Sequence, residues 1–115
     1  MPSRGEVWLA SLDPRRGTEP GKTRPVLLLQ AQALLDAGHP STLVVPTTPL
    51  LDDAEPLRVR VPESQRLRRP PDLLVDQLRA IDNRRLIEGP LTRLPRPLMA
   101  RVDEAVREVL GLPGA

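Results

Sequence analysis

The chain has 115 residues and a formal net charge of +2, which fits a single domain of modest stability. It contains no cysteine and one histidine, which excludes disulfides, thiol nucleophiles, thiolate metal sites and histidine pairs. No segment approaches the roughly 18 apolar residues of a membrane span, and the first residues lack the apolar centre of a signal peptide. The sequence therefore predicts a cytoplasmic protein without membrane contact.

Short apolar segments in the first half of the chain predict β-strands. Residues 5–12 alternate in part, residues 23–30 form a run typical of a strand buried on both faces, and residues 41–48 form a third strand. The segment between the first two contains two glycines and is too long for a two-residue hairpin, so we expect a long loop. Residues 31–38 are expected to form a helical turn that ends at Gly38.

The second half of the chain adds strands and ends in a helix. Residues 57–64 alternate strictly, which predicts a strand with one face in water. Residues 72–82 continue the strand pattern, and Leu78 belongs either to this strand or to a bend after Gln77. Residues 86–94 are expected to turn at their glycine–proline pair and to add a short strand. The apolar spacing over residues 98–110 predicts an amphipathic helix. About five or more antiparallel strands followed by one helix predict a small barrel or an α+β domain, as a single unit over residues 1–115.

The type of cation in the chain favours an anionic partner. Every cationic side chain except Lys22 is arginine. Arginine binds phosphate through two parallel hydrogen bonds, although a high-GC genome produces the same bias, and composition alone leaves both explanations open. Trp8 is the sole aromatic residue, so a nucleic-acid surface here does not use aromatic stacking.

The set of residue types narrows the chemistry that an enzyme could perform here. His39 precedes a proline in a turn context and is expected to be an exposed loop residue. The remaining groups are carboxylates, arginines, hydroxyls and the backbone. RNA cleavage by the neighbouring 2′-hydroxyl suits this set, because it needs only a base, an acid and donors directed at the charge that develops on the phosphorus oxygens.

Four segments carry a resemblance to a known family. They read RGEVWLASLDPRRGTEPGKTRPVLLLQ, LVVPTT, LLVDQLRAIDNRRL and LPRPLMARVDEAVREVLGL. The sequence resembles the MazF/PemK-like toxin endoribonucleases of type II toxin–antitoxin systems. The resemblance implies a mainly β (α+β) fold, an SH3-like small antiparallel barrel with a C-terminal helix, working as a homodimer. It also implies cleavage of single-stranded mRNA at a short motif without metal or cofactor, products with a 2′,3′-cyclic phosphate and a 5′-hydroxyl, and neutralisation by a cognate antitoxin with an acidic flexible tail.

The resemblance implies two catalytic positions. Arg24 occupies the place of the arginine that faces the scissile phosphate, and the proline after it restricts Arg24 to extended backbone angles. The competing interpretation is a surface arginine that caps a loop or pairs with Glu19. Thr48 matches the second position, where its hydroxyl is expected to donate to a non-bridging oxygen. Family members often have serine after it, where this chain has Pro49; Thr47 is a candidate substitute, although it should point to the opposite face.

Other positions are candidates for supporting roles or RNA contact. Glu19 matches a loop carboxylate, Thr18 lies where one branch of the family has histidine, and Asp76 and Gln77 match a pair beside the RNA groove. In one branch an arginine two residues before this aspartate is assigned as the general acid. This chain has Leu74 there, so that scheme does not transfer, and the general base and acid stay unassigned. Contacts with RNA phosphates or bases are also expected from Arg15, Arg16, Lys22 and Arg79.

Two other functions stay open. Gyrase poisons of the CcdB type share the barrel without being enzymes, but they act through a tryptophan-containing C-terminal end, and this chain ends in GLPGA. A catalytically weakened RNA-binding barrel is compatible with Leu74 and Pro49.

Overall fold

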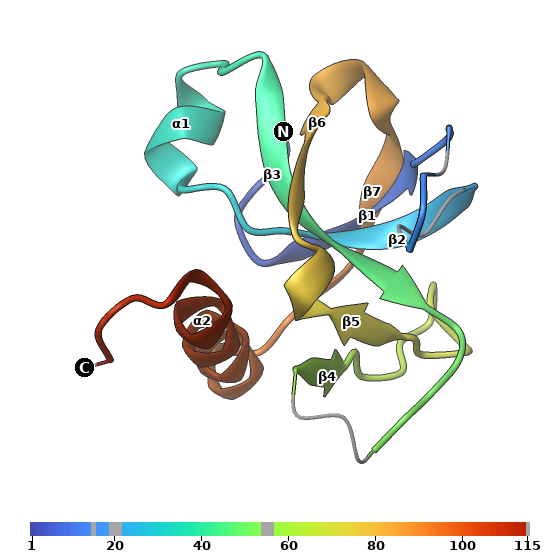
Figure 1. The fold of residues 1–115 in the computed structure, drawn as a ribbon. Helices are drawn as coiled ribbons and strands as arrows, with labels where there is room; N and C mark the ends of the chain where they lie inside the picture. The colour runs from blue at the N-terminus through green and yellow to red at the C-terminus, as the bar shows by residue number, and fades with distance from the viewer. Residues whose placement is uncertain (15, 19–21, 54–56, 115) are drawn as a thin grey trace.

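The computed structural model describes residues 1–14, 16–18, 22–53 and 57–114. Within them, seven strands and a long C-terminal helix make up the fold (Figure 1). The elements in chain order are β1 (Glu6–Ser11), β2 (Thr23–Leu28), α1 (Gln32–Asp36), β3 (Ser41–Thr48), β4 (Arg58–Arg60), β5 (Asp72–Leu74), the 3-10 helix η1 (Val75–Gln77), β6 (Arg79–Asp82), the 3-10 helix η2 (Asn83–Arg85), β7 (Leu86–Arg93) and α2 (Arg96–Leu110).

The strands form one curved antiparallel sheet with β3 at its centre. The order is β4-β5-β3-β2-β1-β7, and β6 pairs with β3 as well. β2 lies along one edge of β3, while β6 and then β5 lie along the other. Figure 1 shows α2 beside the β4–β5 end of the sheet. The predicted mainly β small barrel with a C-terminal helix is confirmed, with the qualification that the order of the described strands runs from β4 to β7 without closing.

The two faces of the sheet carry separate apolar clusters. The larger cluster joins the sheet to α2, and the smaller cluster lies on the opposite face with Trp8 packed against it. Successive strand residues alternate between them: Val26 and Leu28 belong to the smaller cluster, and Leu27 and Leu29 belong to the larger. The prediction that this segment is buried on both faces is confirmed, because all four side chains are buried.

Helix α2 forms as the apolar spacing predicts. Pro95 precedes the first turn, and Gly111 ends the helix in the left-handed conformation with φ 67°. Val102 and Ala105 are buried in the larger cluster. In the described part of the chain, no helix has the length and apolar character needed to cross a membrane.

Two sequence-based predictions of local structure are wrong. Residues 72–82 are not one strand, because η1 interrupts them. Leu73 pairs with Thr47 and Arg79 pairs with Val44, so three steps along β3 correspond to six steps along the partner segment. The 3-10 helix η1 accommodates the three additional residues. The predicted turn at Gly89 is also absent: β7 runs through it, with register shifts against β1 on either side of Leu9. The strand predicted over 57–64 is shorter, at Arg58–Arg60, although its alternation is as expected.

Candidate functional site

The sheet face with the smaller apolar cluster becomes polar at the start of β2 and the end of β3. Val26 pairs with Pro46, and continuing this register by two residues sets Arg24 opposite Thr48. Alternation puts both side chains on the face of Val26. Continuation of the β2–β3 register thus places the two predicted catalytic positions opposite each other on separate strands.

The neighbouring threonines of β3 face opposite sides of the sheet. Thr47 is 1% exposed, and its hydroxyl donates to the carbonyl oxygen of Pro25 at 2.6 Å. Thr48 is half-buried, and its hydroxyl oxygen accepts a hydrogen bond from the Leu50 amide at 3.2 Å. The expectation that Thr47 points away from Thr48 is therefore confirmed, and the Thr47 hydroxyl is committed to β2.

Cross-strand pairing extends this polar surface over β5 and β4. Thr48 pairs with Asp72, Asp72 pairs with Arg60, and Leu74 pairs with Arg58. Farther along the same edge of β3, Arg79 of β6 pairs with Val44, which belongs to the smaller cluster. Directly paired residues share a face. We call this surface the polar face; among the described residues it comprises Arg24, Thr48, Arg58, Arg60, Asp72 and Arg79.

Asp72 is the buried centre of an ion-pair network on the polar face. Its side chain is 2% exposed and accepts from Arg60 Nε at 2.9 Å and from the Asp52 amide at 2.8 Å. Arg58 Nη1 lies 3.6 Å from its Oδ2 atom. Burial alone raises the pKa of Asp72, but the hydrogen bond from Arg60, together with the Asp52 amide and the two guanidinium charges, holds this pKa below its ordinary value. The carboxylate is therefore charged and fixes both arginines.

A groove of about 250 Å³ lies next to the polar face. It is lined by Thr18, Arg58, Leu74, Asp76 and Gln77. Gln77 Nε2 donates to the Thr18 hydroxyl at 3.4 Å, which links the loop after β1 to η1. Three residues that the sequence analysis singled out therefore meet at one groove, from segments far apart in the chain.

The remaining candidates lie on the loop between β1 and β2 or outside the described residues. Arg16 and Lys22 are exposed. The Lys22 amide donates to Asp13 Oδ1 at 2.6 Å, and its carbonyl accepts from the Leu12 amide at 2.8 Å, so the base of the loop is closed by hydrogen bonds. Arg15 and Glu19 are outside the described residues, and their roles stay predictions.

Sequence reasoning did not single out Arg58, Arg60 or Asp72 as site residues. The pattern that could have identified the two arginines is the strict alternation of residues 57–61, which predicts that both lie on the polar side of a strand. What the pattern could not supply was the pairing of that strand with β5, because register depends on contacts between distant segments.

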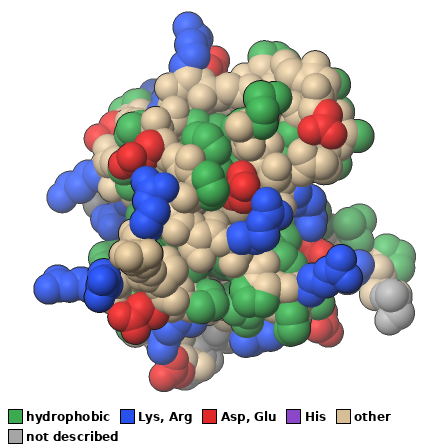
Figure 2. All heavy atoms as spheres, turned by 180° about the vertical axis from the view of Figure 1, so that it is seen from behind, with side chains coloured by type: hydrophobic (Ala, Val, Ile, Leu, Met, Phe, Trp, Pro, Cys, Tyr) green, Lys and Arg blue, Asp and Glu red, His purple; other side chains and the backbone are tan. Residues whose placement is uncertain are grey.

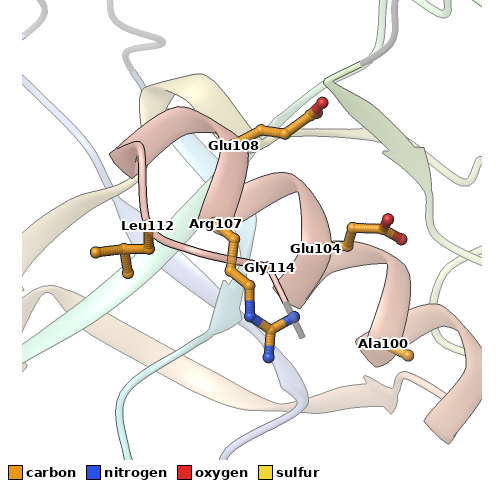
Figure 3. A pocket seen from close by; sticks show the side chains of 6 residues that line it. All are labelled: Ala100, Glu104, Arg107, Glu108, Leu112 and Gly114. Atoms are coloured by element: carbon orange, nitrogen blue, oxygen red, sulfur yellow. The ribbon is translucent and has the colours of Figure 1, made fainter.

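Two other surfaces carry mixed charge. A hollow of about 390 Å³ on α2 combines one guanidinium, of Arg107, with the carboxylates of Glu104 and Glu108 (Figure 3). On the face turned away from the viewer in Figure 1, basic and acidic side chains are intermingled (Figure 2). Among the described residues, the polar face carries four arginines, and two of them, Arg58 and Arg60, contact the carboxylate of Asp72.

Solved structures with the same architecture are MazF toxins and related endoribonucleases. MazF from Deinococcus radiodurans matches with a TM-score of 0.81 over 96% of this chain and 97% of that chain, at 25% identity. The Mycobacterium tuberculosis toxin MazF-mt6 matches with a TM-score of 0.77 over 95% and 99%, at 21% identity. An endoribonuclease in complex with its cognate antitoxin, from a mycobacterial species, matches with a TM-score of 0.77 over the whole of both chains, at 20% identity.

The sequence itself identifies the family. The model of the PemK-like, MazF-like toxins of type II toxin–antitoxin systems matches residues 3–110. The chain belongs to this toxin family, and the resemblance noted in its four sequence segments is confirmed.

Proposed function

We propose that the protein is an endoribonuclease toxin that cuts single-stranded mRNA at a short sequence motif. The observation that carries this proposal is the register of β2 against β3, whose continuation by two residues sets Arg24 opposite Thr48 at the edge of an arginine-rich face. An RNA strand laid on this face meets donors for its phosphates and a hydroxyl beside one of them. The family match and the endoribonuclease with the same fold support the same activity.

The reaction needs only groups of the protein and of the RNA. The ribose 2′-oxygen attacks the adjacent phosphorus as its proton passes to a base. The bond from phosphorus to O5′ breaks, and O5′ takes up a proton. The products are a 2′,3′-cyclic phosphate and a 5′-hydroxyl, so atoms and charge balance without an external nucleophile.

Arg24 and Thr48 act on the charge that develops at phosphorus. The Arg24 guanidinium donates two parallel hydrogen bonds to the phosphoryl oxygens. The Thr48 hydroxyl donates to a non-bridging oxygen. Since Pro25 limits Arg24 to extended backbone angles, the donors are oriented before RNA binds. Preorganised donors of this kind stabilise the transition state more than the ground state.

The polar face also suits the partner of such a toxin. Arg58 and Arg60 pair with Asp72 and Asp53, and Arg24 and Arg79 add positive charge to the same face. A cognate antitoxin with an acidic flexible tail would occupy this face and exclude RNA. We expect the toxin to act in the cytoplasm as a homodimer, as the family resemblance implies.

Cleavage of a long natural RNA tests the proposal. The purified protein is incubated with single-stranded RNA in EDTA, and the new 5′ ends are sequenced. Discrete cuts at one repeated motif, with 5′-hydroxyl ends, are the expected result. Binding without cuts would instead support an RNA-binding barrel, and intact RNA together with inhibited gyrase would support a gyrase poison.

A further inference from the structure

We propose that Arg58 binds a phosphate of the RNA strand beside the one that is cut, and that Asp72 is the positioning residue that directs Arg58 toward it. The inference rests on the proposed function and adds a substrate contact and its support to that site. Neither residue belongs to the positions that the family resemblance singled out.

Arg58 lies at the groove beside the polar face. Arg58 on β4 pairs with Leu74 on β5, so the two side chains share a face, and both line the groove beside η1. Among the described residues that line this groove, Arg58 is the sole cation. Its side chain is 22% exposed, which leaves it accessible to a ligand in the groove.

The guanidinium of Arg58 is held in a defined orientation by two contacts. Arg58 Nη1 donates to the Leu50 carbonyl oxygen at 2.6 Å and lies 3.6 Å from Asp72 Oδ2. Both contacts hold the guanidinium against the sheet, and Arg58 also borders a hollow that it shares with Glu104 and Glu108 of α2. The Leu50 amide in turn donates to Thr48. Residue 50 therefore connects Arg58 with Thr48 through two hydrogen bonds, which sets a phosphate bound at Arg58 in a defined place relative to the hydroxyl.

The two arginines that contact Asp72 differ in how far their charge is neutralised. Arg60 is neutralised by two carboxylates, Asp72 at 2.9 Å and Asp53 at 2.7 Å. Among the described residues, the carboxylate that forms an ion pair with Arg58 is Asp72, at the longer distance of 3.6 Å, and Asp76 lines the same groove. Because Coulomb attraction weakens with distance and Arg60 already satisfies much of the Asp72 charge, Arg58 keeps more of its positive potential. Two arginines of one short strand thus differ: Arg60 completes the network, and Arg58 presents charge to the groove.

The test compares these two arginines. Binding is measured with a single-stranded oligonucleotide that contains the mapped cleavage motif and a 2′-deoxy sugar at the cut site, so that it cannot react. We expect Arg58→Gln to weaken binding about tenfold, since a hydrogen bond to a charged group is lost. The slope of log Kd against log salt should fall by about 0.7, as for one phosphate contact on a single strand. The matched control, Arg60→Gln, should leave this slope unchanged.

Two further variants separate positioning from general structure. Arg58→Lys retains the charge and should restore the salt slope while recovering only part of the affinity. Asp72→Asn should weaken binding in the wild-type background, but it should add little in the Arg58→Gln background, because its effect passes through Arg58. Trp8 fluorescence and thermal melting report whether each variant is folded.

The failure of this inference is distinguishable from failure of the proposed function. If wild-type protein cuts RNA but Arg58→Gln and Arg60→Gln bind it alike, the assignment of Arg58 is wrong. A full additional effect of Asp72→Asn in the Arg58→Gln background would remove Asp72 from the positioning role. If wild-type protein neither binds nor cuts RNA, the proposed function fails and the assignment of Arg58 fails with it.

Discussion

The hydroxyl of Thr47 donates to the carbonyl oxygen of Pro25 at 2.6 Å, where β2 and β3 approach their polar ends. Proline occupies position 25 on one strand and position 46 on the other, and neither can donate a backbone hydrogen bond. The side chain of Thr47 therefore supplies a cross-strand bond where the backbone ladder is depleted. This bond stabilises the register that sets Arg24 opposite Thr48.

The two threonines should separate stability from activity. Thr47→Val removes the bond to Pro25 and should lower the free energy of unfolding by about 1–2 kcal/mol. Thr48→Val should change that free energy by less than about 0.5 kcal/mol, because the side chain lies at a strand end. It should nevertheless slow RNA cleavage by about 10–100-fold through the lost donor. Urea denaturation followed by Trp8 fluorescence and single-turnover cleavage measure the two effects. The opposite pattern, a stable Thr47→Val and an unstable Thr48→Val, would contradict the orientation of β3.

Replacement of Arg24 should abolish activity without unfolding the protein. Arg24→Ala removes the bidentate donor, and we expect cleavage to slow by about 100–1000-fold or more. Arg24→Lys should remain poor, because an ammonium group lacks the planar fork. The matched control is Arg107→Ala on α2, whose guanidinium lies in the mixed-charge hollow of Figure 3. An Arg24→Ala protein that cuts RNA at the wild-type rate would refute the role assigned to Arg24.

The sequence predicts structural features that depend on neighbouring residues better than features that depend on pairing between distant segments. The strand at 41–48 and the helix after Pro95 were predictable, because alternation, helical spacing and capping residues are local signals. The course of residues 72–82 was not, since η1 is required only by the spacing of pairings along β3. The same limit applies to the site: Arg24 and Thr48 were accessible from motifs, whereas the network around Asp72 depends on strand pairing.

The contact between Gly89 and Trp8 predicts a steric cost. A Cβ atom at Gly89 would lie 2.4 Å from Cδ2 of the indole ring, closer than any tolerable contact. Gly89→Ala should therefore displace Trp8 or β7 and lower the free energy of unfolding by about 1–3 kcal/mol. The fluorescence of Trp8, the only tryptophan, reports the displacement directly.

Gly114→Ala is the control for this substitution, because nothing lies within 4 Å of the Cβ position there. It should leave both the unfolding midpoint and the Trp8 spectrum unchanged. Equal stability of the two variants would show that β7 accommodates a side chain at Gly89 and that the close approach is not required.

The pair of Asp82 and Arg84 predicts a pH-dependent contribution to stability. Asp82 accepts side-chain hydrogen bonds from Arg84 and its backbone amide at 2.8 Å, and these contacts lower the pKa of Asp82 to about 2. Aspartate in an unfolded chain has a pKa of about 3.9, so the charged form stabilises the folded state above that pH. The contribution is lost as the pH falls from about 4 through about 2.

Wild type should therefore be more stable than Asp82→Asn at neutral pH, with a difference that shrinks below pH about 4. Arg84→Gln removes the partner and should flatten the same pH dependence. Melting temperatures measured from pH 7 down to the acid transition test both expectations. A difference between wild type and Asp82→Asn that stays constant through this range would contradict the assigned pKa.

The central place of β3 has a consequence for how proteins of this shape diversify. β3 is held on one side by β2 and on the other by β5 and β6, and Thr48 is its last residue. The loop between β1 and β2 and the loop after Thr48 lie outside this framework, so they can vary in length and residue type without altering β3. Among natural variants of the chain, we therefore expect these two loops to differ widely in sequence and the residues of β3 to change slowly.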